Sequence, residues 1–264
     1  MPNRECVLRA TGVTVTRDGR NILDGIDLEV REGERWVVLG PNGCGKTTLL
    51  RTLSLYLHPS KGEIAVLGRE LGTFDIRPVR PRIAYASASL AGELRPALTA
   101  EEIVMIAKNG ALEPWWHEYS DADRDKARDC LGRMGVGGFA ARPLGSLSSG
   151  EQQRVLLARS LMTDPVAILL DEPSARLDLG GREQLVRVLD SFAREMPLLP
   201  TVIVTHHVDE IPVSTTHAML MRDGRSVAQG PVAEVIDSAR LSRCFGMDLI
   251  VDRRPNGRFT AWAR

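Results

Sequence analysis

The feature that most constrains this chain is a nine-residue segment, Gly40-Pro41-Asn42-Gly43-Cys44-Gly45-Lys46-Thr47-Thr48. It fits the pattern G-x-x-x-x-G-K-[ST] at every fixed position. The glycines let main-chain N–H groups converge on a polyphosphate, Lys46 can reach the outer phosphates, and the Thr47 hydroxyl can bind Mg²⁺. The segment follows the apolar run Trp36–Leu39, which is typical of a buried strand, and precedes a helix-like run at residues 47–53. A strand, a phosphate-binding loop and a helix in this order predict an α/β fold.

A second buried strand is predicted at Val166–Leu170, and the acids Asp171 and Glu172 follow it directly. An acid at the end of a strand beside a phosphate loop typically holds Mg²⁺, directly or through water. Adjacent residues of a strand point to opposite faces, so the two acids cannot easily share one role. We therefore assign Asp171 to the metal and Glu172 to the attacking water as a general base. Together the two motifs indicate a P-loop NTPase.

A third motif narrows the class further. Residues Leu147–Arg154 have the sequence L-S-S-G-E-Q-Q-R, which resembles the signature sequence of ABC-type ATPases and lies shortly before the strand that ends at Asp171. The segments Ser174–Asp178 and Thr205-His206 resemble the D-loop and the switch-histidine loop of the same family. Five motifs in family order thus cover residues 40–206.

The resemblance implies an α/β P-loop NTPase fold with a mixed β-sheet core, an antiparallel β-subdomain and an inserted α-helical subdomain. We expect one domain over residues 1–264, with the catalytic core and β-subdomain at about 1–85 and 163–247. The helical subdomain with the signature is expected at about 86–162. Asn256-Gly257 predicts the tip of a C-terminal hairpin at about 248–264.

The resemblance also implies that ATP and Mg²⁺ bind at sites that form only when two copies dimerise head to tail. Lys46, Glu172 and His206 form the implied catalytic set, with His206 contacting the γ-phosphate in its own subunit, and Asp178 would cross the dimer interface. A helix N-terminus is a ready anion site. The signature residues would use it to contact the nucleotide of the opposite subunit: Ser148, Ser149, Gly150 and Glu151.

Two positions depart from the family pattern. Where the family has an aromatic residue for adenine stacking, this chain has Arg17, which can stack on adenine for about 0.5–2 kcal/mol or be a solvated turn residue. Where the family has the glutamine that contacts Mg²⁺ or water in the loop that docks the transmembrane partner, this chain has Ala88. Ser87 or Ser89 can replace that glutamine in part.

Three segments resemble one branch of the family, the stand-alone ATPases related to the molybdate importer's ATPase subunits. They are the loop with Ser87 and Ser89, residues 205–212, and the basic tail near Gly257-Arg258-Phe259. The segment around Trp115-Trp116 is either a recognition site or a packed anchor between helices. The four cysteines are scattered without metal-binding spacing, which favours reduced thiols.

The leading function hypothesis is an ATPase whose dimer drives separately encoded transmembrane subunits. The alternatives are an ABC ATPase that works on a soluble partner in regulation or repair, and a nucleotide-binding module without hydrolysis. A formal net charge of zero gives no general attraction to nucleic acid, so no direct nucleic-acid partner is expected. No apolar run approaches the ~20 residues of a membrane span, and the N-terminus does not resemble a secretion signal. We therefore expect a cytoplasmic protein, peripheral to the inner face of the membrane through a partner.

Overall fold

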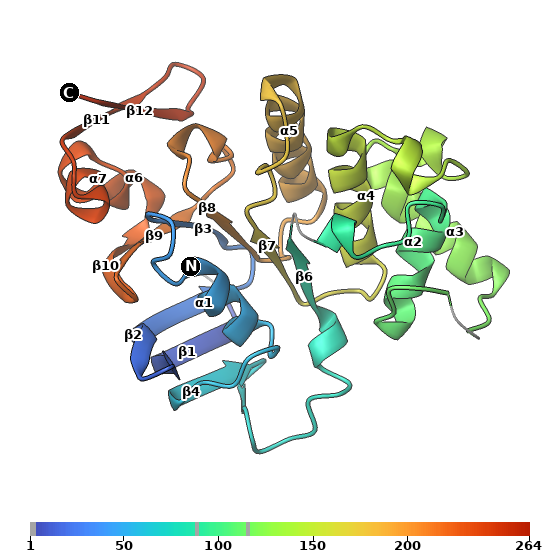
Figure 1. Cartoon of the computed structure of the whole chain (residues 1–264), viewed down its shortest axis with the longest axis horizontal. Coiled ribbons are helices and arrows are strands. Elements are labelled where there is room, and N and C mark those ends of the chain that lie inside the picture. The colour runs from blue at the N-terminus through green and yellow to red at the C-terminus, as the bar shows by residue number, and fades with distance from the viewer. Residues whose placement is uncertain (1–3, 88–89, 115–116) are drawn as a thin grey trace.

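The computed structural model describes residues 4–87, 90–114 and 117–264, so Ala88, Ser89 and the Trp115-Trp116 pair lie outside the described residues. Within the described residues the chain forms a six-stranded sheet, a four-stranded antiparallel sheet, a two-stranded hairpin and several helices (Figure 1). The predicted α/β class, with a mixed sheet and an antiparallel sheet, is confirmed.

The strands are β1 (Cys6–Arg17), β2 (Arg20–Arg31), β3 (Arg35–Leu39), β4 (Lys61–Val66), β5 (Arg69–Glu70), β6 (Ile83–Ser87), β7 (Ala167–Asp171), β8 (Thr201–Thr205), β9 (His217–Arg222), β10 (Arg225–Pro231), β11 (Leu249–Arg253) and β12 (Phe259–Ala263). The α-helices are α1 (Lys46–Leu53), α2 (Ala100–Met105), α3 (Asp121–Arg133), α4 (Ser149–Leu161), α5 (Leu179–Glu195), α6 (Val232–Val235) and α7 (Ser238–Phe245). Short 3₁₀ helices are η1 (Arg80–Arg82), η2 (Leu90–Gly92), η3 (Ile106–Asn109), η4 (Gly137–Phe139), η5 (Leu144–Ser146) and η6 (Val208–Glu210).

The six-stranded sheet has the order β10-β9-β3-β8-β7-β6, and its strands from β9 to β6 run parallel. All residues of β7 and β8 are buried, as expected for parallel strands covered on both faces. The register pairs Leu39 with Thr205 and Ser87 with Asp171, so the carboxyl ends of β3, β8, β7 and β6 meet along one edge. Ligands of open α/β sheets bind at this edge, and it carries the predicted site.

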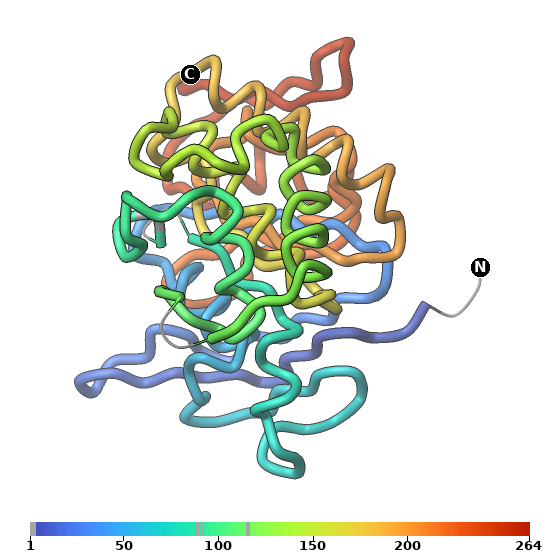
Figure 2. Tube along the Cα trace, turned by 90° about the vertical axis from the view of Figure 1, so that its right-hand side faces the viewer, coloured from blue at the N-terminus to red at the C-terminus, as the bar shows by residue number. Residues whose placement is uncertain are grey.

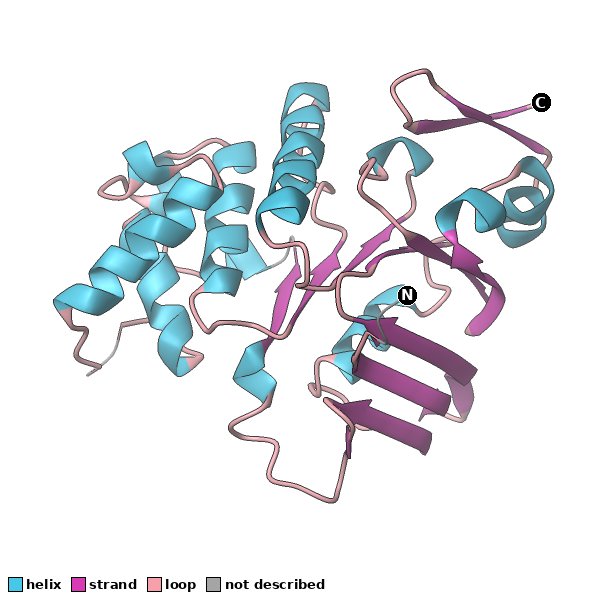
Figure 3. Ribbon diagram, turned by 180° about the vertical axis from the view of Figure 1, so that it is seen from behind, coloured by secondary structure: helices cyan, strands magenta, loops and turns pink. Residues whose placement is uncertain are grey.

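The four-stranded sheet, in the order β2-β1-β4-β5, lies on the α1 side of the six-stranded sheet. Figure 3 shows it from behind, and in Figure 2 its blue strands lie below the helices and the C-terminal segment. Helix α1 is covered by both sheets, because Leu49, Leu50 and Leu53 are fully buried in one core cluster with residues of β1, β2 and β7. The phosphate-binding loop therefore leads into a helix that is fixed on two sides.

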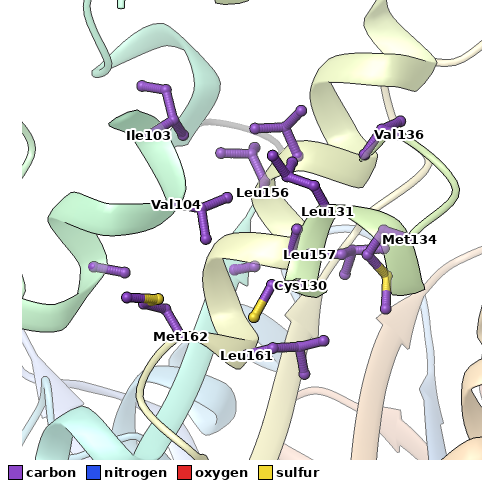
Figure 4. Close-up of a cluster of buried hydrophobic side chains, with 14 of the residues drawn as sticks. Ile103, Val104, Cys130, Leu131, Met134, Val136, Leu156, Leu157, Leu161 and Met162 are labelled. Carbon is purple, nitrogen blue, oxygen red and sulfur yellow. The ribbon is translucent and has the colours of Figure 1, made fainter. Parts of the chain in front are cut away.

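Helices α2, α3 and α4 form a separate group beyond the β6 edge of the sheet (Figure 1). Figure 4 shows their shared core, in which Ile103 and Val104 of α2 lie near Leu131 of α3 and Leu156 of α4. Each of these three helices begins with a capping box. In it, a Ser or Thr side chain accepts from the main-chain N–H three residues later, and the acidic side chain at that later position accepts from the N–H of the Ser or Thr. These caps place the helix starts at Ala100, Asp121 and Ser149.

The strands β11 and β12 form an antiparallel hairpin at the C-terminal end, and Gly257 has the left-handed φ of 86° that its turn requires. Helices α6 and α7, which precede the hairpin, were not predicted from the sequence. Arg258 anchors the hairpin by donating to the Glu183 carboxylate at 2.5 Å and to the main-chain oxygen of Asp209. The hairpin therefore contacts α5 and the loop that follows β8.

Candidate functional site

The loop between β3 and α1 has backbone geometry that only glycine satisfies at two positions. A Cβ on Gly40 would lie 2.1 Å from the main-chain oxygen of Met221. Gly45 has φ of 103°, and a Cβ there would lie 2.7 Å from the main-chain oxygen of Ile22. Both contacts are with backbone, which cannot easily move aside. The two fixed glycines of the sequence pattern therefore have a packing reason in this fold.

Lys46, the first residue of α1, extends its ammonium group back over this loop. Its Nζ donates to the main-chain oxygens of Gly40 at 2.8 Å and Pro41 at 3.0 Å, and the side chain is buried. A cavity of about 270 Å³ adjoins it, lined by Ile22, Asn42, Gly43, Gly45, Lys46, Thr47, Thr48 and Glu172. A buried cation and the N-terminus of a helix together make this cavity suited to a polyphosphate.

Cys44 also lies in this loop, but its thiol is not suited to chemistry. The side chain is buried, and burial raises the pKa of the thiol above its ordinary value. A thiol is nucleophilic only as the thiolate, which a raised pKa disfavours. We therefore assign Cys44 no chemical role through its thiol.

Asp171, the last residue of β7, is buried and has a hydrogen-bond donor on each carboxylate oxygen. The Thr47 hydroxyl donates to Oδ1 at 3.0 Å and the Tyr85 hydroxyl donates to Oδ2 at 3.0 Å. Burial raises the pKa of Asp171, while both hydroxyl groups act in the opposite direction. Burial and the Asp171 charge also raise the pKa of Tyr85, so the phenol remains a donor.

The Thr47–Asp171 pair fits a Mg²⁺ ion that is held together with substrate phosphates. Mg²⁺ usually keeps several waters and takes one or two carboxylates plus phosphate oxygens. Here one hydroxyl and one carboxylate lie in contact at the edge of the phosphate loop. Across the described residues, no three His, Cys, Asp or Glu side chains gather in a group that would hold a metal by themselves. One hydroxyl and one carboxylate suit a metal ion whose other ligands are phosphate oxygens of the nucleotide and water.

Glu172 leaves the strand in a left-handed conformation, with φ of 46°. A non-glycine residue in this region costs of order 1–3 kcal/mol, and such residues cluster at functional sites. Glu172 is the first residue after β7, so the strand alternation predicted from the sequence does not separate it from Asp171. Glu172 Oε1 lies 3.3 Å from His206 Nδ1, and both side chains are about one-third exposed. Glu172 also lines the cavity beside Lys46.

The loop that carries His206 is held by a buried network. The Thr205 hydroxyl donates to Glu210 Oε2 at 2.5 Å and accepts from the main-chain N–H of His207 at 3.1 Å. Arg182, in the first turn of α5, lies 3.7 Å from Glu210 Oε1 and donates to a main-chain oxygen of the preceding loop. The rings of His206 and His207 are 4.0 Å apart between centroids, which fixes them against one another.

The signature residues lie at the N-terminus of α4 and do not line the cavity of their own chain. Ser148 is the N-cap and accepts from the main-chain N–H of Glu151 at 3.3 Å, while the Glu151 carboxylate accepts from the N–H of Ser148 at 2.7 Å. Glu151 thus shapes the helix start. Ser149 is exposed and Gly150 is partly exposed, so the first turn of α4 is open to another molecule.

Two further predicted residues lie on the surface. Asp178 is exposed and caps α5 by accepting from the main-chain N–H of Gly181 at 2.7 Å, and the neighbouring Leu179 is 74% exposed. Arg17 is exposed at the end of β1, paired with Arg20 across the β1–β2 turn, and is not among the residues that line the cavity. Its stacking role stays a prediction.

Sequence reasoning missed three residues that the structure brings to the site. Ile22 supplies an apolar wall of the cavity, Tyr85 contacts Asp171, and Glu210 holds the loop around His206. Tyr85 and Asp171 are 86 positions apart, so no local pattern joins them. The resemblance to the family's glutamine loop covered the neighbouring positions Ser87 to Ser89 but gave Tyr85 no role.

Comparison with known proteins identifies the family and agrees with the fold. The family described as ABC transporter matches residues 23–175. A putative ABC transporter ATP-binding protein of Streptococcus mutans is 37% identical over 225 residues, which are 85% of this chain and 86% of that protein. The structure of cbiO1 from Clostridium perfringens, part of the ABC transporter complex cbiONQ, superimposes with a TM-score of 0.78 at 26% identity over 90% of this chain and 94% of that one.

A dimeric structure of MJ0796, a bacterial ABC transporter cassette, superimposes with a TM-score of 0.73 at 26% identity and covers 85% of this chain and 98% of that one. The fold and the site define an ATP-binding cassette. The chain belongs to the ABC transporter family of ATP-binding proteins. In the described parts of the chain, no helix is long and apolar enough to cross a membrane.

Proposed function

We propose that two copies of this chain pair head to tail and hydrolyse ATP with Mg²⁺ at two shared sites. The observation that carries the proposal is the meeting of three groups at one edge of the sheet. Lys46 and the phosphate loop line the cavity, and the Thr47–Asp171 pair lies beside it. Glu172 lines the same cavity and contacts His206. These are the parts that phosphoryl transfer to water requires.

Each group has a distinct role in the proposed reaction. Lys46 binds the β- and γ-phosphates, and Thr47 and Asp171 hold Mg²⁺, which supplies neutralisation of phosphate charge. Glu172 accepts a proton from the attacking water, a role worth roughly 10²–10⁴ in rate. His206 contacts the γ-phosphate and is oriented by the carboxylate of Glu172 at 3.3 Å.

The second subunit completes the site in this proposal. The open first turn of α4, with Ser149 and Gly150, supplies main-chain donors and a helix N-terminus to the phosphate bound by the partner. Asp178 lies at the same interface, where an exposed Leu179 would become covered. The dimeric form of the related cassette supports this arrangement.

Mixing two inactive variants tests the composite site. Lys46→Ala removes the phosphate cation and Ser149→Arg blocks the signature, so each variant alone should release little phosphate from Mg-ATP. Random pairing gives half mixed dimers, each with one intact site, so the mixture should recover about a quarter of the wild-type rate. A mixture no more active than the mean of its parts would contradict a site shared between subunits.

The partner of the dimer is proposed to be a transmembrane subunit with an acidic docking segment. A cavity of about 450 Å³ near the Thr47–Asp171 pair is lined by Arg51, Arg80 and Arg159. Arg159 Nε is buried without a hydrogen-bond partner, and Arg80 lies over the exposed ring of Tyr56 at 4.5 Å. The same cavity also contains Glu93 and Asp171, so its three arginines outnumber its two carboxylates. This excess of positive charge suits an acidic segment, and the chain would then lie at the cytoplasmic face of the membrane.

A cassette that acts on a soluble partner is the second candidate, favoured by Ala88 in place of the glutamine expected in the docking loop. Fractionation of the native cells distinguishes the two. The chain should sediment with membranes, and Arg80→Glu should release it while leaving ATP hydrolysis intact. A wild-type chain found entirely in the supernatant supports the soluble partner instead.

A further inference from the structure

Tyr85 is the residue of β6 whose side chain reaches the proposed metal site. Strand β6 lies beside β7 in parallel register, with Tyr85 opposite Leu169 and Ser87 opposite Asp171. The phenol spans the two-residue offset along the sheet and donates to Asp171 Oδ2 at 3.0 Å. A shorter polar side chain at this position would not reach so far, and phenylalanine would reach without a donor.

The carboxylate of Asp171 is divided between two donors. Thr47 donates to one oxygen and Tyr85 to the other, and the side chain is buried. A carboxylate has about four lone-pair sites, so two bonds leave acceptor capacity on each oxygen for a metal ion or its water. Holding Oδ2 from the β6 side therefore fixes the rotation of the carboxylate and keeps Oδ1 toward Thr47.

We infer that Tyr85 is a positioning residue that orients Asp171 for the metal ion bound with nucleotide. The inference rests on the proposed Mg²⁺-dependent function and goes beyond it, because it assigns this task to a residue outside the phosphate loop, the signature and the switch loop. Groups that hydrogen-bond to metal ligands typically change metal affinity by 10–100-fold when removed.

The packing around Tyr85 supports a role for its hydroxyl rather than its ring. The ring is partly buried, packs against the core cluster that includes β7 and α1, and lies 5.8 Å from the ring of Tyr56. Tyr85→Phe would keep these apolar contacts and remove only the hydroxyl group. A cavity that adjoins both Tyr85 and Asp171 leaves room for water to replace part of the lost bond, so the expected effect is at the lower end of the range.

Metal binding without turnover tests the inference. Mn²⁺ replaces Mg²⁺ as a paramagnetic probe, and its affinity is measured by electron paramagnetic resonance with saturating ADP. Tyr85→Phe should weaken Mn²⁺ binding about tenfold, while the affinity for a fluorescent ADP analogue in EDTA stays within twofold of wild type. Tyr56→Phe is the matched control, because it removes a neighbouring hydroxyl that makes no bond to Asp171, and it should change neither affinity.

Three results would overturn the inference, and each is distinguishable. Unchanged Mn²⁺ affinity in Tyr85→Phe would show that the hydroxyl does not orient Asp171. An equal loss of metal-free nucleotide affinity would show that Tyr85 serves the fold of the whole site rather than the metal. A wild-type chain that binds ADP but no Mn²⁺ would refute the proposed Mg²⁺-dependent function, and this inference with it.

Discussion

Replacing Glu210 should loosen the loop that carries His206. Glu210 is buried, its Oε2 accepts from the Thr205 hydroxyl at 2.5 Å, and that hydroxyl also accepts from the N–H of His207 at 3.1 Å. Its other oxygen is buried without a hydrogen bond and lies 3.7 Å from the Arg182 guanidinium. Glu210 therefore ties both backbone neighbours of His206 to the first turn of α5.

The magnitude follows from these contacts. A hydrogen bond to a charged group contributes about 1.5–3 kcal/mol. The partly exposed ion pair with Arg182 at 3.7 Å adds at most ~1 kcal/mol, because it is long and partly screened by solvent. We expect Glu210→Ala to lower the free energy of unfolding by ~3 kcal/mol and the melting temperature by roughly 6–12 °C. Glu210→Gln keeps an acceptor for Thr205 and should lower the free energy of unfolding by only ~1 kcal/mol.

Urea unfolding and steady-state phosphate release measure the two consequences. The turnover number of Glu210→Ala should fall well below wild type even at temperatures where the variant is folded, because His206 is no longer fixed. Asp209→Ala is the control, since it removes an exposed carboxylate from the same loop. Its free energy of unfolding should stay within about 0.5 kcal/mol of wild type. A Glu210→Ala variant as stable and active as this control would refute the argument that the network holds the loop.

Three further predictions concern other parts of the molecule. Lys46→Ala should weaken ATP binding roughly 10–100-fold in calorimetry, because a charged hydrogen-bond donor worth ~1.5–3 kcal/mol is lost; unchanged affinity would place the nucleotide elsewhere. Ser148→Ala removes the cap of α4 and should cost ~1 kcal/mol of stability in urea titration, whereas no loss would mean that the helix start does not depend on it. Burial raises the pKa of Cys130 and Cys244 to about 11, so less thiolate exists at pH 8. Iodoacetamide should therefore modify them on the order of a hundredfold more slowly than in the unfolded chain by mass spectrometry, and equal rates would refute their burial.

The sequence predicted the parts of the site that are local in the chain. The phosphate loop is a continuous segment whose glycines, lysine and threonine have fixed spacing, so its place between β3 and α1 followed from the pattern alone. The strands β3 and β7 were predicted because parallel strands covered on both faces are continuous apolar runs. The C-terminal hairpin followed from the Asn256-Gly257 turn.

The rest depends on contacts between distant segments. Tyr85 meets Asp171 only because β6 pairs with β7, and that pairing joins residues 86 positions apart. The left-handed conformation of Glu172 was not predicted, because nothing in a glutamate marks a positive φ. The cap of α4, by contrast, can be read from local sequence, since Ser148 and Glu151 have the three-residue spacing of a capping box.

The mass of Glu172→Gln in solution with Mg-ATP tests the central claim most directly. The substitution removes the proposed base while leaving Lys46 and the Thr47–Asp171 pair intact, so ATP should bind without being cleaved. Light scattering coupled to size exclusion should then give twice the mass of the monomer, and omission of ATP should return the monomer. A monomeric Glu172→Gln chain at saturating Mg-ATP would contradict a site completed by the signature of a second subunit.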